Sequence, residues 1–343
     1  MMPLFKIGIV GAGSPLGSEL KEALAESAFT AAQFVLMDDA EALGKLDRIG
    51  DEPAVVLGLD ESSFDGLDFV FFAGTKEQTR RWGRDALRAG STVLDLTGVL
   101  DAEKDVLIHS PWMEPQPVEP DLLTRAVVPA HPAALALAML LARLHASGLL
   151  QSAAATVLHP ASEFGAAALD ELHQQTVGLL SFQNVPREVF DAQTAFNHLV
   201  DVGESARINL REAEERICRH LSALSPKGDI SVQVVQAPIF HGLCFSIWVE
   251  LTEAVSQNAV EQALSGAHIE LRTASSESPS SLAAIGQNEI LLRVSAHADG
   301  AANTGNIRRF WLWAACDNLR IAAQNAVDCA LDLRRLRPQG QVQ

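Results

Sequence analysis

The chain has 343 residues, enough for two domains that each bury a hydrophobic core. Hydrophobic residues make up 48% of the chain and charged residues 20%, which is typical of a soluble globular protein. The formal net charge of −17 argues against nucleic acids and anionic membranes as partners, because binding to phosphate groups needs a basic surface.

The cysteines and the apolar segments indicate a cytoplasmic protein. Cys218, Cys244, Cys316 and Cys329 show no CxxC spacing, so we expect reduced thiols rather than a disulfide framework. The N-terminal residues have one lysine before a glycine-rich turn, which is not the pattern of a signal peptide. No apolar run reaches the roughly 18 residues that a membrane-spanning helix needs.

The first 128 residues alternate short apolar strands with amphipathic helices. We expect strands at residues 5–10, 34–37, 69–72 and 92–96, a helix after the first strand, and another at residues 79–89. Strands that alternate with helices of this length predict a parallel, doubly wound sheet, so the fold class is α/β with an N-terminal Rossmann-type domain.

A glycine-rich turn joins the first strand to the first helix. It reads Gly11-Ala12-Gly13-Ser14-Pro15-Leu16-Gly17. Glycines let the backbone approach a pyrophosphate, and the N-terminus of the following helix supplies N–H groups and a positive dipole. The turn therefore predicts dinucleotide binding, with a turn retained only for packing as the alternative.

An acidic turn that contains Asp38, Asp39 and Glu41 follows the second strand. Carboxylates repel the 2′-phosphate of NADP but accept hydrogen bonds from the free ribose hydroxyls of NAD. If a dinucleotide binds, we expect NAD rather than NADP. A solvated acidic turn without a ligand is the alternative.

Residues 129–317 should form the second domain, of α+β type. Long β-rich runs are expected at residues 231–239, 243–251 and 289–294, and helices at 134–144, 162–180 and 210–221. The serine-rich residues 275–281 predict a flexible, exposed loop.

The stretch Leu312-Trp313-Ala314-Ala315-Cys316-Asp317-Asn318-Leu319-Arg320 resembles a segment of the aspartate-semialdehyde dehydrogenases. In that family the strand runs into a helix that packs on the cofactor domain. The resemblance covers nearly the whole chain and implies an NAD(P)-binding domain at residues 1–128, completed by a helix at 318–343, and a catalytic and dimerisation domain at 129–317. It also implies a homodimer, and cofactor contacts from the seven residues of the glycine turn, Asp38 and Asn325.

The ordinary reaction of the family is the NADP-dependent reductive dephosphorylation of aspartyl phosphate to aspartate semialdehyde, through a cysteine thiolate at the head of a helix. Matching segments place His131 at the cysteine, His159 at the supporting glutamine and Asp101 at the phosphate-binding arginine. Another segment places Gln236 at the substrate-binding arginine and Leu243 at the base histidine, with Cys244 beside it.

Replacing several members of a catalytic unit costs orders of magnitude in rate. The resemblance therefore implies a chain that is degenerate for the ordinary reaction and closest in pattern to the Usg-type paralogues of the family. Two alternatives stay open: an active oxidoreductase with altered chemistry on an aldehyde, oxo or acyl-phosphate substrate, and a structural or regulatory dimer partner, including a heterodimer with an authentic dehydrogenase. The site could also hold another small-molecule ligand.

His131, His159, His241 and Cys244 all fall on segments that line the family's active site. Three imidazoles and a thiol can bind zinc or transfer protons. No HxxxH or CxxC pair supports a metal site in the linear sequence, so we expect no metal and interpret the histidines as residues that fill a polar pocket. Helix capping by His131 and a nucleophilic role for Cys244 remain further alternatives.

Overall fold

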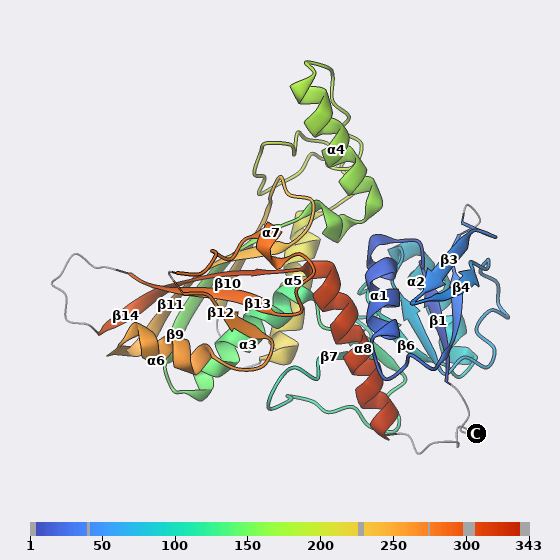
Figure 1. Ribbon diagram of the computed structural model, residues 1–343, viewed down its shortest axis with the longest axis horizontal. Coiled ribbons are helices and arrows are strands. Elements are labelled where there is room, and N and C mark those ends of the chain that lie inside the picture. Colours follow the sequence, from blue (N-terminus) through green and yellow to red (C-terminus); the bar gives the residue numbers. More distant parts are fainter. Residues whose placement is uncertain (1–4, 40–41, 226–229, 274, 298–305, 337–343) are drawn as a thin grey trace. The chain divides into compact units, whose positions relative to one another are not determined.

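A computed structural model describes residues 5–39, 42–225, 230–273, 275–297 and 306–336. The chain divides into two compact units. Residues 1–131 and 322–343 form the first unit, and residues 132–321 form the second. Figure 1 shows the elements of both units in chain order.

The first unit contains a six-stranded sheet of order β2-β1-β5-β6-β8-β7, in which every described pair is parallel. Its strands are β1 (Lys6–Val10), β2 (Gln33–Met37), β5 (Phe69–Phe72), β6 (Thr92–Asp95), β7 (Leu107–His109) and β8 (Ala126–Pro129). The helices are α1 (Pro15–Ala25), α2 (Lys76–Arg88) and the C-terminal part of α8 (Asn318–Leu336). This parallel sheet confirms the expected Rossmann-type fold.

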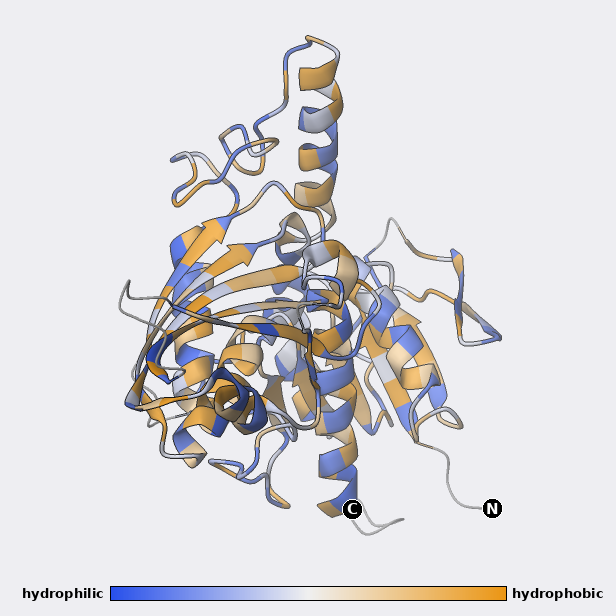
Figure 2. Ribbon diagram, turned by 60° about the vertical axis from the view of Figure 1, so that its left-hand side comes forward, coloured by the Kyte–Doolittle hydropathy of each residue, from blue (hydrophilic) through white to orange (hydrophobic). Residues whose placement is uncertain are grey.

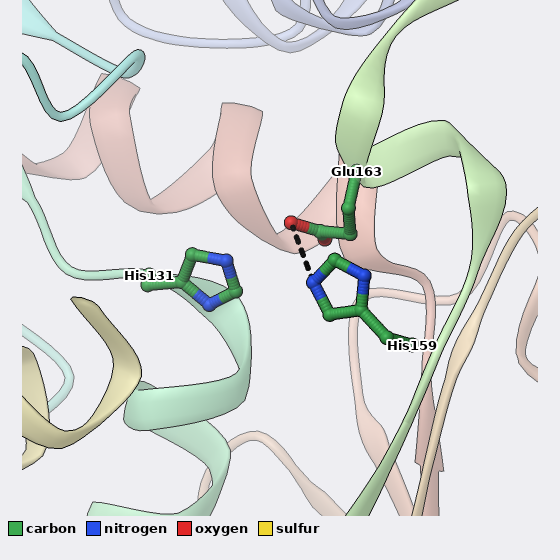
Figure 3. A group of neighbouring side chains, drawn as sticks. All are labelled: His131, His159 and Glu163. Carbon is green, nitrogen blue, oxygen red and sulfur yellow. Dashed lines mark ion pairs between the residues drawn. The ribbon is translucent and has the colours of Figure 1, made fainter. Parts of the chain in front are cut away.

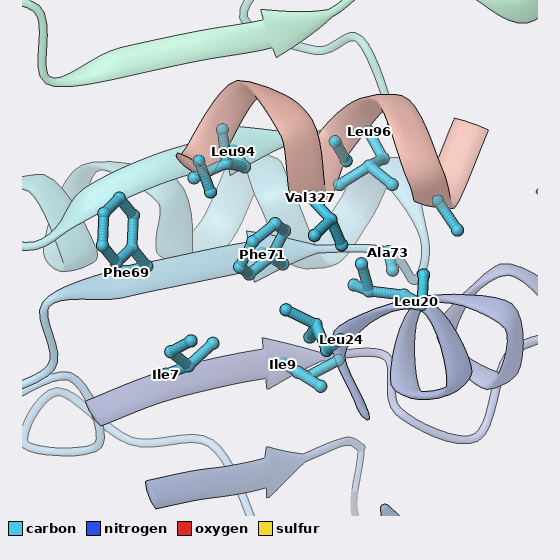
Figure 4. Close-up of a cluster of buried hydrophobic side chains, with 14 of the residues drawn as sticks. Ile7, Ile9, Leu20, Leu24, Phe69, Phe71, Ala73, Leu94, Leu96 and Val327 are labelled. Carbon is cyan, nitrogen blue, oxygen red and sulfur yellow. The ribbon is translucent and has the colours of Figure 1, made fainter. Parts of the chain in front are cut away.

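Alternate residues of β5 explain why its sequence is a continuous apolar run. Phe69 and Phe71 pack with Val327 of α8, while Val70 and Phe72 pack on the opposite face with Trp82 of α2. Figure 4 shows the first of these clusters. A parallel sheet covered on both faces buries every strand residue, so the sequence loses the alternation of a half-exposed strand.

Two local features of the first unit differ from the sequence expectations. Helix α2 begins before residue 79 because Thr75 and Gln78 form a capping box at Lys76. A separate antiparallel pair, β3 (Leu46–Ile49) and β4 (Glu52–Val55), follows β2 and was not expected.

The second unit contains a mixed six-stranded sheet of order β10-β9-β11-β14-β13-β12, which confirms the expected α+β class. The strands are β9 (Leu150–His159), β10 (Ile230–Gln236), β11 (Leu243–Val255), β12 (Ile269–Leu271), β13 (Ile290–Ala296) and β14 (Ile307–Cys316). The helices are α3 (Pro132–Ala146), α4 (Ala166–Leu180), α5 (Leu210–Leu224), α6 (Gln257–Leu264) and α7 (Ser281–Ala284), with a 3₁₀ turn, η1, at Ala161–Phe164.

The two faces of this second sheet differ. Phe245, Ile247 and Val249 of β11 are buried in the core, and α3, α5 and α6 pack against this sheet. On the other face Trp248 lies opposite Trp311 of β14. The side chain of Trp311 is 43% exposed, so this face of the sheet is partly open.

The segment 181–209 is largely irregular and is held to α4 by two buried side chains. Glu171 accepts hydrogen bonds from the backbone N–H groups of Glu188, Val189 and Phe190. Gln175, one turn later, accepts from the N–H groups of Thr194 and Ala195 and donates to the carbonyls of Pro186 and Ala192. Figure 2 shows hydrophobic and hydrophilic residues alternating along α4.

No helix in the part of the chain that the structure describes is both long enough and apolar enough to span a bilayer.

Candidate functional site

The turn between β1 and α1 is built on close backbone approaches. Gly11 has a φ of +79°, and a Cβ atom there would lie 2.1 Å from the Cα of Gly74. A Cβ atom on Gly17 would lie 2.2 Å from the carbonyl oxygen of Gly11. Both positions therefore require glycine for steric reasons.

Ser14 caps the helix that begins at Pro15. Its hydroxyl oxygen accepts a hydrogen bond from the N–H of Gly17 at 2.8 Å and donates to the carbonyl of Ala73 at 2.7 Å. The cap fixes the direction in which the first turn of α1 presents its amides. This is the geometry with which a helix N-terminus binds phosphate groups.

Asp38 follows β2 at the carboxyl edge of the parallel sheet, beside the glycine turn. One carboxylate oxygen accepts from the N–H of Gly13 at 2.9 Å, and the other accepts from the side-chain amide of Gln78 at 2.9 Å. Ligands of open parallel sheets bind along this edge, where the negative charge of Asp38 is placed. Glu41, which belongs to the same acidic turn in the sequence, lies outside the described residues.

Asn325 and Asp101 were expected to contact cofactor and substrate. Asn325 is fully buried; its amide oxygen accepts from the hydroxyl of Ser110 at 2.7 Å, and its amide nitrogen donates to the carbonyl of Ala130 at 3.3 Å. Asp101 is half-buried and follows a loop that Asp95 holds by accepting from the N–H groups of Thr97 and Leu100. The structure gives Asn325 a role in holding the fold.

His131, at the position that the resemblance assigns to the cysteine, lies between β8 and α3. It is the last residue of the first unit, and one peptide bond joins it to Pro132, where α3 begins. Its side chain is 4% exposed.

His159 is the last residue of β9 and is 1% exposed. Its ring lies 5.0 Å from the ring of Phe164, and its Nε2 lies 3.9 Å from the Oε2 of Glu163 in η1. His131, His159 and Glu163 each offer one ligand atom, and these three atoms lie within 4.8 Å of one another (Figure 3).

The remaining predicted site residues lie on β10, β11 and the turn between them. Gln236 is fully buried and lies opposite His159 in the parallel β9–β10 pair, and its amide nitrogen donates to the carbonyl of Ala237. Leu243 is a core residue with no exposed surface. Among the described residues, the group of three ligand atoms contains neither His241 nor Cys244, so Glu163 completes it in place of both.

The four thiols share one electrostatic property. Burial raises the pKa of Cys244 to about 11. Burial also raises the pKa of Cys316 and of Cys329 well above the usual value, and burial together with Glu214 and Glu215 raises that of Cys218. A thiol with a raised pKa is a poor nucleophile near neutral pH, because the thiolate is the reactive form.

Asn318 holds the turns around His159 and Glu163, and Asp317 caps the following helix; the sequence did not reveal either role. The amide oxygen of Asn318 accepts from the N–H of Gly242 at 2.9 Å, and its amide nitrogen donates to the hydroxyl of Ser162 at 3.0 Å. Asp317 accepts from the N–H groups of Leu319 and Arg320 and so caps α8. The segment that resembles the dehydrogenases thus holds the backbone around the candidate site through hydrogen bonds.

Comparisons with known proteins match both parts of the chain to one family. Residues 6–119 match the model of the semialdehyde dehydrogenase NAD-binding domain. Residues 141–321 match the model of the semialdehyde dehydrogenase dimerisation domain.

Similar proteins cover almost the full length. A USG-1 protein homolog of Azotobacter vinelandii is 30% identical over 96% of this chain and 98% of its own length. The aspartate-semialdehyde dehydrogenase of Rickettsia bellii is 25% identical over 97% of this chain and 98% of its own length. The solved structure of a probable aspartate-semialdehyde dehydrogenase from Pseudomonas aeruginosa superimposes with a TM-score of 0.82 at 27% identity, covering 97% of this chain and 99% of that one. The chain belongs to the semialdehyde dehydrogenase family.

Proposed function

We propose that this protein binds a nicotinamide dinucleotide at the glycine turn and does not catalyse the thiol-dependent, phosphate-linked reaction of aspartate semialdehyde. One observation carries the proposal: the head of α3 presents His131 instead of a thiol. The raised pKa of each of the four cysteines supports it. An acyl-enzyme route needs a thiolate whose pKa is lowered by its surroundings.

The other substituted positions support the same conclusion. Leu243 has no group that can accept a proton, and Gln236 and Asp101 carry no positive charge to bind a carboxylate or a phosphate. A substrate would therefore lack its anchor as well as its nucleophile. Members of one catalytic unit act together, so restoring a single member restores little activity.

The decisive assay measures phosphate-dependent reduction of NAD and NADP with aspartate semialdehyde. We expect a rate more than tenfold below an ordinary enzyme turnover of about 10 per second. His131→Cys should remain inactive, because Leu243, Gln236 and Asp101 are unchanged. The aspartate-semialdehyde dehydrogenase of Rickettsia bellii serves as the positive control, and an ordinary turnover by the wild-type chain would refute the proposal.

For the dinucleotide, we propose a preference for NAD over NADP. Asp38 supports it, because its carboxylate bonds the glycine turn directly and adds negative charge where a 2′-phosphate would come close. Ligand binding to the native state raises the melting temperature, so the shifts with the two dinucleotides rank their affinities. A larger shift with NADP would contradict the preference, and no shift with either would favour a purely structural role.

We further propose a homodimer formed through the open face of the second sheet, around Trp248 and Trp311. Two observations support this face as the dimer interface: the side chain of Trp311 is exposed, and the residues match the model of a dimerisation domain. Light scattering should give a mass near twice the 36.8 kDa of one chain. Trp311→Glu should shift the mass toward the monomer, whereas Leu123→Glu, at a residue that is 84% exposed in the first unit, should not.

A monomeric wild-type chain in that experiment would contradict the homodimer. It would instead favour pairing with a different subunit.

A further inference from the structure

Two imidazoles and one carboxylate converge where β9, η1 and α3 begin or end. We propose that His131, His159 and Glu163 bind a divalent transition-metal ion of the Zn²⁺ class. The sequence argued against a metal because it contains no paired histidine or cysteine motif. The structure supplies the missing ligand as Glu163, four residues after His159.

The backbone that carries the ligands is held in place by hydrogen bonds. The N–H groups of Ala161 and Ser162 donate to the carbonyls of Ile239 and Phe240 at 2.9 and 3.0 Å. The side-chain amide of Asn318 joins the hydroxyl of Ser162 to the backbone N–H of Gly242, in the turn before β11. His159 is fixed by its place at the end of β9, and His131 by its peptide bond to the first residue of α3. A site on anchored elements loses little entropy when it binds an ion.

The distances suit a small rearrangement around a metal. Two ligands of a tetrahedral Zn²⁺ site, each about 2.1 Å from the ion, are roughly 3.4 Å apart. The Nε2 of His159 and the Oε2 of Glu163 are 3.9 Å apart, and the three candidate ligand atoms lie within 4.8 Å. Rotation of the side chains closes differences of this size without backbone movement.

Burial and charge also suit a cation. His131 and His159 are 4% and 1% exposed, and the side chain of Glu163 is 11% exposed. A carboxylate in such surroundings is stabilised by a positive charge that it touches. The dipole at the N-terminus of α3 opposes a cation, but this effect is small compared with direct coordination.

The ligand set selects the kind of metal. Ca²⁺ and Mg²⁺ prefer oxygen ligands, whereas two imidazoles with one carboxylate suit Zn²⁺ and Co²⁺. Three protein ligands leave a fourth position for water or a ligand oxygen, as in zinc sites that are open to small molecules.

The test is a metal titration of the full chain after dialysis against a chelator and then against chelator-free buffer. Co²⁺ serves as the probe, because its visible absorption becomes intense in four-coordinate sites. We expect about one Co²⁺ per chain, and competition by Zn²⁺ that removes the absorption. Absence of stoichiometric binding by the wild-type chain would overturn the proposal, whatever the variants do.

The variants locate the ion. Glu163→Gln and His131→Asn remove ligands from different elements, and each should weaken Co²⁺ binding at least about 100-fold. His173→Asn changes an exposed histidine on α4 and should leave the affinity unchanged. The melting temperature of each metal-free variant shows whether it folds, and the two ligand variants give independent tests. Unchanged affinity in a folded ligand variant would also overturn the proposal.

Discussion

The connection from β1 to α1 and the connection from β8 to α3 both join a parallel strand to a helix. They differ in whether the backbone restricts which amino acid each position can hold. After β1, backbone contacts within about 2 Å of any added Cβ require glycine at positions 11 and 17. After β8, the head of α3 carries His131, which is not among the described residues with a positive φ, so its backbone conformation does not call for glycine. Positions fixed by the backbone keep their residues to keep the fold, while a position fixed only by chemistry can change without unfolding the chain.

The strongest test of this difference is Gly17→Ala. The added methyl would meet the carbonyl of Gly11 at 2.2 Å, so the turn must move. We expect a loss of stability of about 1–3 kcal/mol and at least a 100-fold weaker dinucleotide affinity. Chemical denaturation and calorimetric titration measure the two effects.

Gly83→Ala is the matched control. Its Cβ would meet a side-chain carbon of Thr79 at 3.6 Å, an ordinary contact within helix α2. This variant should be about 0.4–1 kcal/mol more stable than the wild type, because alanine favours the helix. Equal destabilisation by both variants would show that the glycine turn is not specially constrained.

Thiol reactivity tests the chemical side of the comparison. The raised pKa values of Cys218, Cys244, Cys316 and Cys329 predict little thiolate at neutral pH. We expect each to react with iodoacetamide at least about tenfold more slowly than free cysteine. Intact mass spectrometry follows the modification with time, and any native thiol that reacts faster than free cysteine contradicts the proposed loss of thiol chemistry.

Asp38→Asn tests cofactor choice with little change of shape. The amide keeps an oxygen that can accept from the N–H of Gly13, but it removes the charge. We expect the preference for NAD over NADP to fall about tenfold, or roughly 1.4 kcal/mol, which is close to the value of about 1 kcal/mol for unit charges about 4 Å apart in bulk water. Dissociation constants for both dinucleotides give the ratio, and an unchanged ratio would remove Asp38 as the determinant.

The smallest expected effect concerns pH and the scaffold of the first unit. Burial lowers the pKa of His109 below 6.5, although Asp332, 3.0 Å away, partly opposes the shift. A lowered pKa means that the unfolded chain binds the proton more readily. The stability from neutral His109 is therefore fully present above pH 6.5 and is lost as the pH falls toward the folded-state pKa.

We expect a loss of about 1 kcal/mol at most over the first pH unit below that value. His109→Gln should remove this part of the dependence, seen as the difference between the denaturation curves of variant and wild type. An identical pH dependence in both proteins would assign it to other groups.

The sequence predicted those elements whose pattern of hydrophobic residues matches their burial in the fold. Fully buried strands such as β5 appear in the sequence as apolar runs. The close backbone approaches of the glycine turn appear in the sequence as glycines. Strand β9 was not predicted, because Leu150–His159 has three consecutive alanines at its centre, and alanine has little strand preference. The two faces of β11 could not be told apart from its apolar sequence: Phe245, Ile247 and Val249 are core residues, whereas Trp248, opposite Trp311, lies on the other face.

The candidate site was less predictable, because it depends on where strands end. His131 and His159 were singled out from the sequence, but Glu163 joins them only because η1 follows β9 directly. The spacing of four residues from His159 was the available signal. Residues 275–281 show the same limit: they were expected to be flexible, yet Trp313 and Arg293 donate hydrogen bonds to the carbonyls of Pro279 and Ser276.

The attachment of residues 181–209 to α4 has a consequence for how this part of the chain can evolve. Glu171 and Gln175 bond mainly to backbone atoms of the segment, and every amino acid supplies a backbone carbonyl while all but proline supply the N–H. Most substitutions in the segment therefore leave its attachment intact, whereas a single change at either helix position releases several bonds at once. Sequence drift has little effect along the loop and a large effect at two points, so the surface that the loop presents can be remodelled while its path over the protein stays the same.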